Sequence, residues 1–186
     1  RRLSASPYAE CALGTSPSHS YPYIVTEIDP GTGALFARNV WGGEFGGRIA
    51  FADLAGKHTS WTGDRTEFLG RNRTLDDPLA LELGGPLSGR VGAGLDPCAA
   101  LQLSIDLEAG ERAEIVWFIG QTADREQARL LLERYRGADV DALFYDPLHP
   151  YTQALLRSIP RIGQKARGRL ESIKGVVPDP YAIPKG

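Results

Sequence analysis

The sequence has no methionine, and none of its apolar runs approaches the roughly 20 residues that a membrane-spanning helix needs. Residues 1–7 also lack the apolar core of a secretory signal peptide. From these absences we expect a piece of a longer protein or a trimmed chain, with no direct insertion into a membrane. The expected location is the cytoplasm, with the inner face of the membrane as the alternative.

Cysteine and histidine are scarce. The two cysteines, Cys11 and Cys98, are too few for a disulfide framework and are expected to be buried thiols of a cytosolic protein. The three histidines, His19, His58 and His149, lie far apart, and no histidine–cysteine group has the spacing of metal ligands. The sequence therefore predicts no metal site and gives no sign of a catalytic histidine.

A phosphate-binding loop is also missing. Nucleotide hydrolysis needs a glycine-rich loop of the form Gly-x-x-x-x-Gly-Lys-Ser/Thr, and the glycines at 89–94 have the wrong spacing. No bound cofactor is predicted. The formal net charge of −2 gives no electrostatic reason to expect a nucleic-acid partner.

The residues that are present suit a soluble domain built from short segments. The hydrophobic fraction of 42% and the charged fraction of 24% are ordinary, while 22 glycines and 13 prolines divide the chain finely. The turn at 29–33, Asp-Pro-Gly-Thr-Gly, predicts a hairpin. Strands are expected at 21–28, 34–39, 48–54, 59–62, 67–69, 101–107 and 114–120, with a weaker candidate within 3–13. Loops are expected at 15–20 and 76–85, the second with at most one helical turn.

One helix is predicted after these strands. Asp124 and Gln127 fit a helix cap, the apolar side chains of 124–135 recur on one face, and Gly137 is placed to end the helix. Strands followed by a single helix favour an antiparallel β-sandwich over a βαβ fold. The predicted fold is thus mainly β, an antiparallel β-sandwich with one or two short C-terminal helices and an extended tail. The core is predicted to include Phe51, Leu103, Ile105, Trp117 and Phe118.

The most informative stretch is 60–72, in which charged groups and aromatic rings are flanked by Gly63 and Gly70. Aromatic faces beside planar polar groups suit a sugar, which offers hydroxyls at its rim and C–H groups on its faces. The structural alternative is an ion-paired β-turn-β segment with Trp61 and Phe68 in the core. The candidate carbohydrate-binding residues are Trp61, Asp64, Arg65, Glu67, Arg71 and Asn72.

This stretch, together with 26–39 and 87–102, resembles the glycoside hydrolase family 94 module of cyclic β-1,2-glucan synthases, a family that includes cellobiose phosphorylase. The resemblance covers residues 1–142 and implies a supersandwich-like β-sandwich that precedes a catalytic α-helical barrel. The family usually carries tryptophan where Cys11 stands, which implies different packing near the N-terminus. In that family the barrel supplies the catalytic acid, so we expect no catalytic residue and no enzymatic activity in this chain alone.

Residues 143–186 differ in character. The run Asp146–Pro160, with its His-Pro-Tyr-Thr core, and the run 169–180 resemble the C-terminal region of oligopeptide/dipeptide ABC-transporter ATP-binding subunits. A short helix is expected at 150–159, followed by an extended segment.

Three functions follow from the two resemblances. The first is a non-catalytic accessory sandwich of a β-glucan synthase or phosphorylase, whose partners are a weakly bound β-glucan or oligosaccharide, a second copy of the chain, or a catalytic barrel domain. The second is a fragment related to the ATP-binding subunit of a peptide transporter. The third is an inactive fused or truncated reading frame.

Overall fold

A computed structural model of the protein describes residues 2–43 and 46–136. The chain divides into two compact units, Arg1–Arg136 and Gly137–Gly186, and every described element lies in the first. The helix expected at 150–159 and the extended tail fall outside the described residues. The division of the chain into domains 1–142 and 143–186 stays a prediction.

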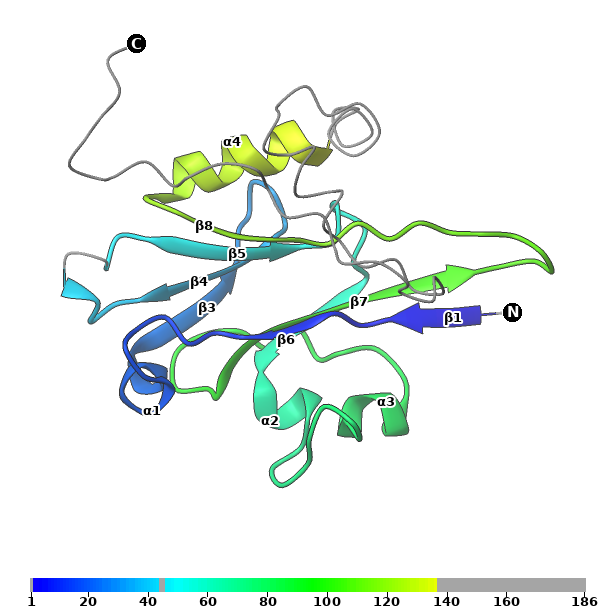
Figure 1. Cartoon of the computed structure of the whole chain (residues 1–186), viewed down its shortest axis with the longest axis horizontal. Coiled ribbons are helices and arrows are strands. Elements are labelled where there is room, and N and C mark those ends of the chain that lie inside the picture. The colour runs from blue at the N-terminus through cyan, green and yellow to red at the C-terminus, as the bar shows by residue number, and fades with distance from the viewer. Residues whose placement is uncertain (1, 44–45, 137–186) are drawn as a thin grey trace, which may run out of the picture. The chain divides into compact units, whose positions relative to one another are not determined.

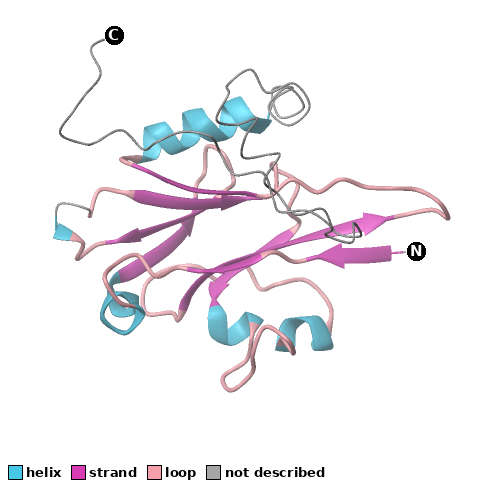
Figure 2. Ribbon diagram, viewed as in Figure 1, coloured by secondary structure: helices cyan, strands magenta, loops and turns pink. Residues whose placement is uncertain are grey.

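The first unit contains two four-stranded sheets, and every strand pair in them is antiparallel (Figures 1 and 2). The first sheet is made of β1 (Arg2–Ala5), β2 (Tyr8–Glu10), β6 (Ser60–Asp64) and β7 (Pro97–Asp106). The second is made of β3 (Ile24–Ile28), β4 (Leu35–Asn39), β5 (Ile49–Asp53) and β8 (Phe118–Thr122). In the first sheet, β7 is the central strand and pairs with all three others, and in the second the strands follow the order β3-β4-β5-β8. The mainly β, antiparallel fold predicted from the sequence is confirmed.

Helices cover the outer faces of both sheets. The long helix α4 (Arg125–Arg136) lies on the second sheet, while α2 (Arg65–Phe68) and α3 (Leu79–Leu83) lie against the first (Figure 1). The short helix α1 (Pro17–Ser20) and the 3-10 turn η1 (Tyr21–Tyr23) lead into β3. The helix predicted at 124–135 is confirmed, and the Gln127 amide donates to Asp124 Oδ1 at 2.9 Å, as its cap requires.

The core is layered in the same way. Between the sheets lie mostly aliphatic and small side chains, among them Ile24, Leu35, Leu54 and Leu101. A second cluster beneath α4 centres on Phe36 and Leu132, and a third lies between α2, α3 and β7. Cys11 and Cys98 are both buried and unpaired, and burial raises the pKa of the Cys11 thiol to about 12.

The hairpin predicted at 29–33 is confirmed, and its turn also anchors α4. Asp29 is fully buried and accepts hydrogen bonds from the backbone N–H and the hydroxyl of Thr32, at 3.0 and 2.9 Å. The same carboxylate accepts from Arg125 at 2.8 Å and from Arg129 at 2.7 Å. At the other end of α4, Arg136 makes two hydrogen bonds to the buried carboxylate of Asp53, at 2.7 and 2.9 Å. Two carboxylates of the second sheet therefore hold both ends of the helix.

Three local predictions were wrong. The strand expected at 21–28 begins only at Ile24, because residues 21–23 form the 3-10 turn η1. Residues 15–20 are not a plain loop, because Pro17 occupies the first turn of α1 and the Ser20 hydroxyl donates to the carbonyl of Ser16 at 2.9 Å. Residues 67–69 are not a strand, because the Asp64 side chain accepts from the Thr66 amide at 3.0 Å and caps α2.

The burial predicted for the last strands was only partly right. Phe51 is buried as predicted, whereas Leu103, Ile105 and Phe118 are half-buried and Trp117 is 37% exposed. Strand β8 begins only at Phe118, and as an edge strand it has a single neighbour, β5. The run 114–120 is therefore not a strand buried on both faces.

Strand β7 starts earlier than predicted and does not show the expected alternation. Its first six residues are all buried. Cys98 and Ala100 pack with Phe68 of α2 on the outer face, while Ala99 and Leu101 face the space between the sheets. Beyond Gln102 the helical cover ends and β7 becomes partly exposed.

Candidate functional site

The predicted carbohydrate-binding residues begin at the corner where β6 leads into α2. Asp64 ends the strand, is 6% exposed, and caps α2 through the Thr66 amide. Its other carboxylate oxygen accepts from Arg90 Nη1 at 3.0 Å. Arg65, the first residue of α2, donates to Asp96 at 3.0 Å and lies 3.4 Å from Glu10. The hydrogen bond to Asp96 raises the pKa of the Arg65 guanidinium, which remains charged.

Glu67 links this corner by hydrogen bonds to the segment 88–92, which lies about 20 residues further along the chain. Its carboxylate accepts from the Thr62 hydroxyl at 2.7 Å and from the backbone amide and hydroxyl of Ser88 at 2.8 and 2.6 Å. The segment 88–92 then runs beside both sheets: the Gly63 amide donates to Arg90 O at 2.7 Å, and the Thr26 amide donates to Gly92 O at 3.1 Å. Asp64, Arg65 and Glu67 therefore hold loops together through hydrogen bonds within the domain.

The other three predicted residues lie in different surroundings. Trp61 packs against the core between the sheets, with His58 edge-on at 5.6 Å, and its indole nitrogen is buried without an acceptor among the described residues. Arg71 and Asn72 are exposed in the loop after α2. The structure thus gathers Asp64, Arg65 and Glu67 at one corner, turns Trp61 toward the core between the sheets, and places Arg71 and Asn72 beyond the corner. As the structural alternative predicts, Phe68 is in the core; Trp61 is only half-buried.

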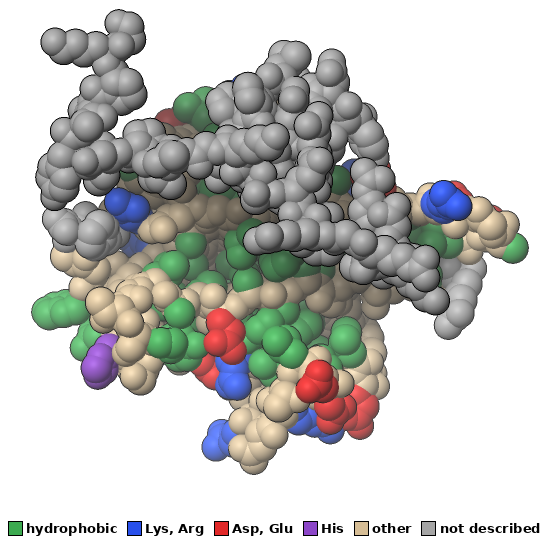
Figure 3. Space-filling view, in the orientation of Figure 1, with side chains coloured by type: hydrophobic (Ala, Val, Ile, Leu, Met, Phe, Trp, Pro, Cys, Tyr) green, Lys and Arg blue, Asp and Glu red, His purple; other side chains and the backbone are tan. Residues whose placement is uncertain are grey.

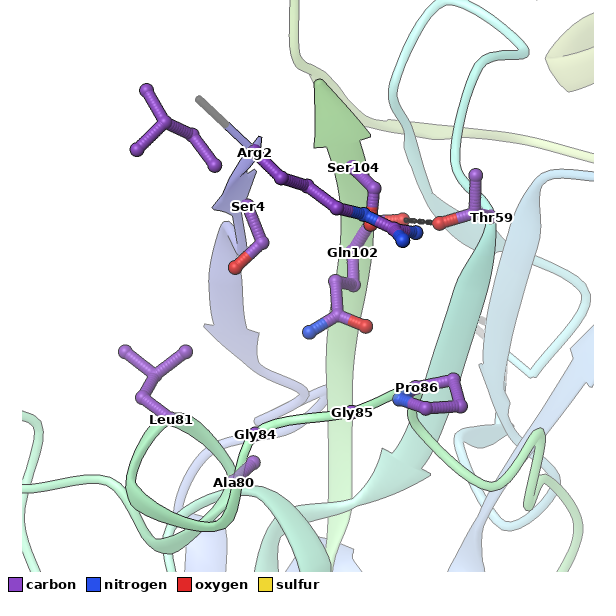
Figure 4. Close-up of a pocket in the computed structure, with 11 residues that line it drawn as sticks. Arg2, Ser4, Thr59, Ala80, Leu81, Gly84, Gly85, Pro86, Gln102 and Ser104 are labelled. Carbon is purple, nitrogen blue, oxygen red and sulfur yellow. Dashed lines mark hydrogen bonds between the residues drawn. The ribbon is translucent and has the colours of Figure 1, made fainter. Parts of the chain in front are cut away.

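Near the start of β6, away from this corner, a groove of about 610 Å³ opens between the uncovered end of β7 and α3, and none of the predicted residues lines it (Figure 4). Its floor is polar and comes from β1 and β7, where Ser4 pairs with Ser104. Its wall is apolar and comes from α3 and the turn that follows. The lining residues are Arg2, Leu3, Ser4, Thr59, Ala80, Leu81, Gly84, Gly85, Pro86, Gln102 and Ser104.

Gln102 is the most strongly positioned polar group in the groove. It is 6% exposed, and its side-chain oxygen accepts from the Ser60 hydroxyl at 2.8 Å. Ser60 in turn accepts from the Leu87 amide at 3.0 Å, so the orientation of the Gln102 amide is fixed. Figure 4 shows the amide nitrogen on the side of Ser4 and Leu81, where it directs its two N–H donors toward the groove.

The groove was not predicted from the sequence, although β7 contains a signal for it. Alternate residues of a strand share one face, and on the outer face of β7 the side chains change from Cys98 and Ala100 to Gln102 and Ser104. The first two lie under α2 and α3, and the last two form the groove floor. The change from apolar to polar side chains along this face of β7 marks the point beyond which α2 and α3 no longer cover the strand.

Charged side chains surround the α2–α3 end of the first unit, where acidic and basic groups are mixed (Figure 3). Arg73 pairs there with Asp77 and Glu82. Within 2–43 and 46–136, no group of three histidine, cysteine, aspartate or glutamate side chains is placed to hold a metal ion. Over the same residues, no helix combines the length and the apolar character needed to cross a membrane.

The comparisons with known proteins agree with this architecture. The family model described as "Glycosyl hydrolase 94, supersandwich domain" matches residues 1–138. The chain belongs to this family. The supersandwich domain is 35% identical over 136 residues to the cyclic beta-(1,2)-glucan synthase NdvB of Rhizobium meliloti, an alignment that covers 73% of this chain and 5% of NdvB. The chain thus spans a small part of that relative.

The chain also resembles a different class of protein, in alignments of 84 and 68 residues that are longer than the 50 residues of 137–186. A family model described as "Oligopeptide/dipeptide transporter, C-terminal region" matches residues 137–186. The dipeptide transport ATP-binding protein DppD of Haemophilus influenzae is 40% identical over 84 residues, 45% of this chain and 21% of DppD. The oligopeptide transport ATP-binding protein AppD of Bacillus subtilis is 43% identical over 68 residues, 37% of this chain and 20% of AppD. Both resemblances stated from the sequence are confirmed.

Proposed function

We propose that the supersandwich domain is a non-catalytic, carbohydrate-binding accessory part of an enzyme of the β-glucan synthase or phosphorylase type. The observation that carries the proposal is the groove beside β7, where the fixed Gln102 amide lies opposite the apolar wall of α3. The family assignment and the similarity to NdvB, a cyclic beta-(1,2)-glucan synthase, support a glucan as the ligand. The proposed partners are a β-glucan, a second copy of the chain and a catalytic barrel domain. A cytoplasmic location stays a prediction.

The chemistry of the groove suits a pyranose ring. The Gln102 amide and the hydroxyls of Ser4 and Ser104 offer donors and acceptors for sugar hydroxyls. Leu81, 51% exposed, and Pro86 offer an apolar surface for the C–H face of the ring. The volume of about 610 Å³ falls within the usual range of ligand pockets. In this proposal Glu67 acts indirectly, because its bonds to Ser88 hold the loop segment that follows the groove wall.

Sugar binding is expected to be weak, with a dissociation constant of about 1 mM, because the groove is open rather than enclosing. The test is a two-dimensional NMR titration of the full chain with a β-1,2-linked glucose trisaccharide. We expect the resonances of Gln102 and Ser104 to shift. The prediction that Trp61, Asp64, Arg65, Glu67, Arg71 and Asn72 contact the sugar is tested in the same spectra.

The decisive variant is Gln102→Glu, which keeps the oxygen that Ser60 needs and removes the two N–H donors. We expect it to weaken binding about tenfold, as the loss of a specific hydrogen-bond donor should. The matched control is Gln127→Glu on the exposed face of α4, which should bind like the parent chain. Equal affinity of parent and Gln102→Glu, or no shifts at tens of millimolar (about ten times the expected dissociation constant), contradicts the proposal.

A second candidate function rests on the resemblance of 137–186 to peptide-transporter ATP-binding proteins. The sequence has no phosphate-binding loop, so we expect no binding of ATP. Calorimetric titration of the full chain with Mg-ATP checks this, with a P-loop ATPase as positive control. Heat of binding at micromolar ATP would instead favour the transporter function.

A further inference from the structure

We propose that a second groove, at the end of the first unit where α1 lies, stacks a pyranose ring of a glucan on the Trp41–Tyr23 pair. This inference rests on the proposed carbohydrate-binding function and adds a separate site to it. The groove measures about 580 Å³ and is formed by the segment before α1, by α1 and η1, by the end of β4 and the turn after it, by Arg48 just before β5, and by β8. The side chains used below are those of His19, Tyr23, Asn39, Trp41 and Gln121.

The aromatic pair is unusually exposed for its size. The Trp41 side chain is 76% exposed and Tyr23 is 41% exposed, yet their rings stack with centroids 5.6 Å apart and planes inclined by 26°. Figure 3 shows apolar atoms protruding at the end of the molecule where β4 and β5 are connected. Burying the exposed indole would be favourable by about 25 cal/mol for each Å² of apolar surface removed from water. A ligand that covers the ring recovers that free energy.

The backbone that carries Trp41 is held in place. The Asn39 side chain accepts from the Trp41 amide at 2.9 Å and donates to the carbonyl of Leu13 at 2.7 Å. Asn39 thereby ties the start of the Trp41 turn to the segment on the opposite side of the groove. The Asn39 bonds to the backbone and the stacking on Tyr23 thus hold Trp41 before any ligand arrives, which lowers the entropic cost of binding.

Polar side chains line the groove together with the ring pair. His19 and Gln121 line the groove together with the hydroxyls of Thr15, Ser16 and Ser20. No carboxylate is among the described lining residues. A protein partner would call for a broad apolar patch with a polar rim. One aromatic pair beside amide, imidazole and hydroxyl groups instead matches the C–H face and the hydroxyl edge of a pyranose.

The experiment follows the side-chain N–H signals of the tryptophans in the full chain, labelled with ¹⁵N, during titration with the β-1,2-linked glucose trisaccharide. The three tryptophans are Trp41, Trp61 and Trp117, and single substitutions assign their signals. We expect the Trp41 signal to shift and the Trp117 signal to stay. Trp41→Ala should weaken binding at this groove at least about tenfold, as removal of a central aromatic contact does. Trp117→Ala, which removes another exposed indole, is the matched control.

The proposals for the two grooves can be refuted independently of each other. If Gln102 responds to the sugar but Trp41 does not, the second site is refuted and the proposed function stands. If neither responds, the proposed function fails with it. A Trp41 signal that moves with protein concentration in the absence of sugar would identify a second copy of the chain as the occupant and would overturn the inference. In the Gln102→Glu variant, the shift of Trp41 should persist.

Discussion

Replacing Asp29 by asparagine is expected to destabilise the first unit by about 2–3 kcal/mol at neutral pH. The carboxylate is fully buried and accepts hydrogen bonds from Arg125, Arg129 and Thr32. Asparagine has the same shape but no charge, so two guanidinium groups would face a neutral amide. The loss stays below that of a fully buried ion pair because both arginine side chains keep about a third of their surface in water, 34% and 32%. Urea-induced unfolding measures the difference.

The same carboxylate predicts a dependence on pH. Burial alone would raise the pKa of Asp29, but the hydrogen bonds from Arg129, Arg125 and Thr32 outweigh it and hold the pKa well below its ordinary value. A carboxyl with a lowered folded-state pKa stabilises the fold above its unfolded pKa, about 4, and loses that contribution as the pH falls. The stability difference between parent and Asp29→Asn should therefore be full at pH 7 and shrink below about pH 4.

The control for this substitution is Asp77→Asn, at a carboxylate that is 71% exposed and paired with Arg73 on the surface. Its effect should stay within about 0.5 kcal/mol. Asp29→Asn could lower the free energy of unfolding no more than Asp77→Asn does, or by the same amount at pH 7 and pH 3. Either result would show that the charge of Asp29 does not anchor α4.

Replacing Gly63 by alanine is expected to destabilise the first unit by about 3 kcal/mol. A Cβ atom at this position would lie 2.4 Å from the Thr26 hydroxyl oxygen and 3.0 Å from Thr26 Cβ. Thr26 is 1% exposed, and its hydroxyl accepts from the Gly92 amide at 3.1 Å, so it has little room to move. The clash falls where β3, β6 and the segment 88–92 meet. Thermal and urea unfolding should both report it.

Two further variants separate this clash from a general effect of alanine. Gly47→Ala places a Cβ no closer than 3.8 Å to any neighbour and should change stability by less than about 1 kcal/mol. Thr26→Ala removes the oxygen that Gly63→Ala would meet, so the double variant should recover at least about 1 kcal/mol relative to the sum of the single effects. Additive effects would mean that Gly63 is required for another reason.

Elements governed by neighbouring residues could be predicted from the sequence. The hairpin follows from the turn at Asp29–Gly33, and α4 follows from the Asp124 cap and its apolar face. The exposure of Trp117 could not be predicted, because it depends on β8 being an edge strand, which is a property of the strand order. The buried outer face of β7 likewise depends on two short helices that pack on it from elsewhere in the sequence.

The same distinction applies to the candidate site. Asp64, Arg65 and Glu67 lie at one corner because they are close together in the sequence. Their partners, Arg90, Asp96 and Ser88, come from a segment about 20 to 30 residues further on. Sequence spacing could not reveal that the charged groups of Asp64, Arg65 and Glu67 already form hydrogen bonds with these partners. Nor could it bring Ser4 beside Ser104 to form the groove floor.

The attachment of α4 at both ends has a mechanical consequence. Arg136 is the last described residue, and its guanidinium is bonded to Asp53 at the end of β5. Tension applied to the chain beyond this point should load that ion pair, and with it strand β5, before the helix can peel from its C-terminal end. At the first turn of α4, the bonds from Arg125 and Arg129 to Asp29 would bear any remaining load. The ion pairs at the two ends of α4 should therefore make the helix resist a force applied beyond Arg136.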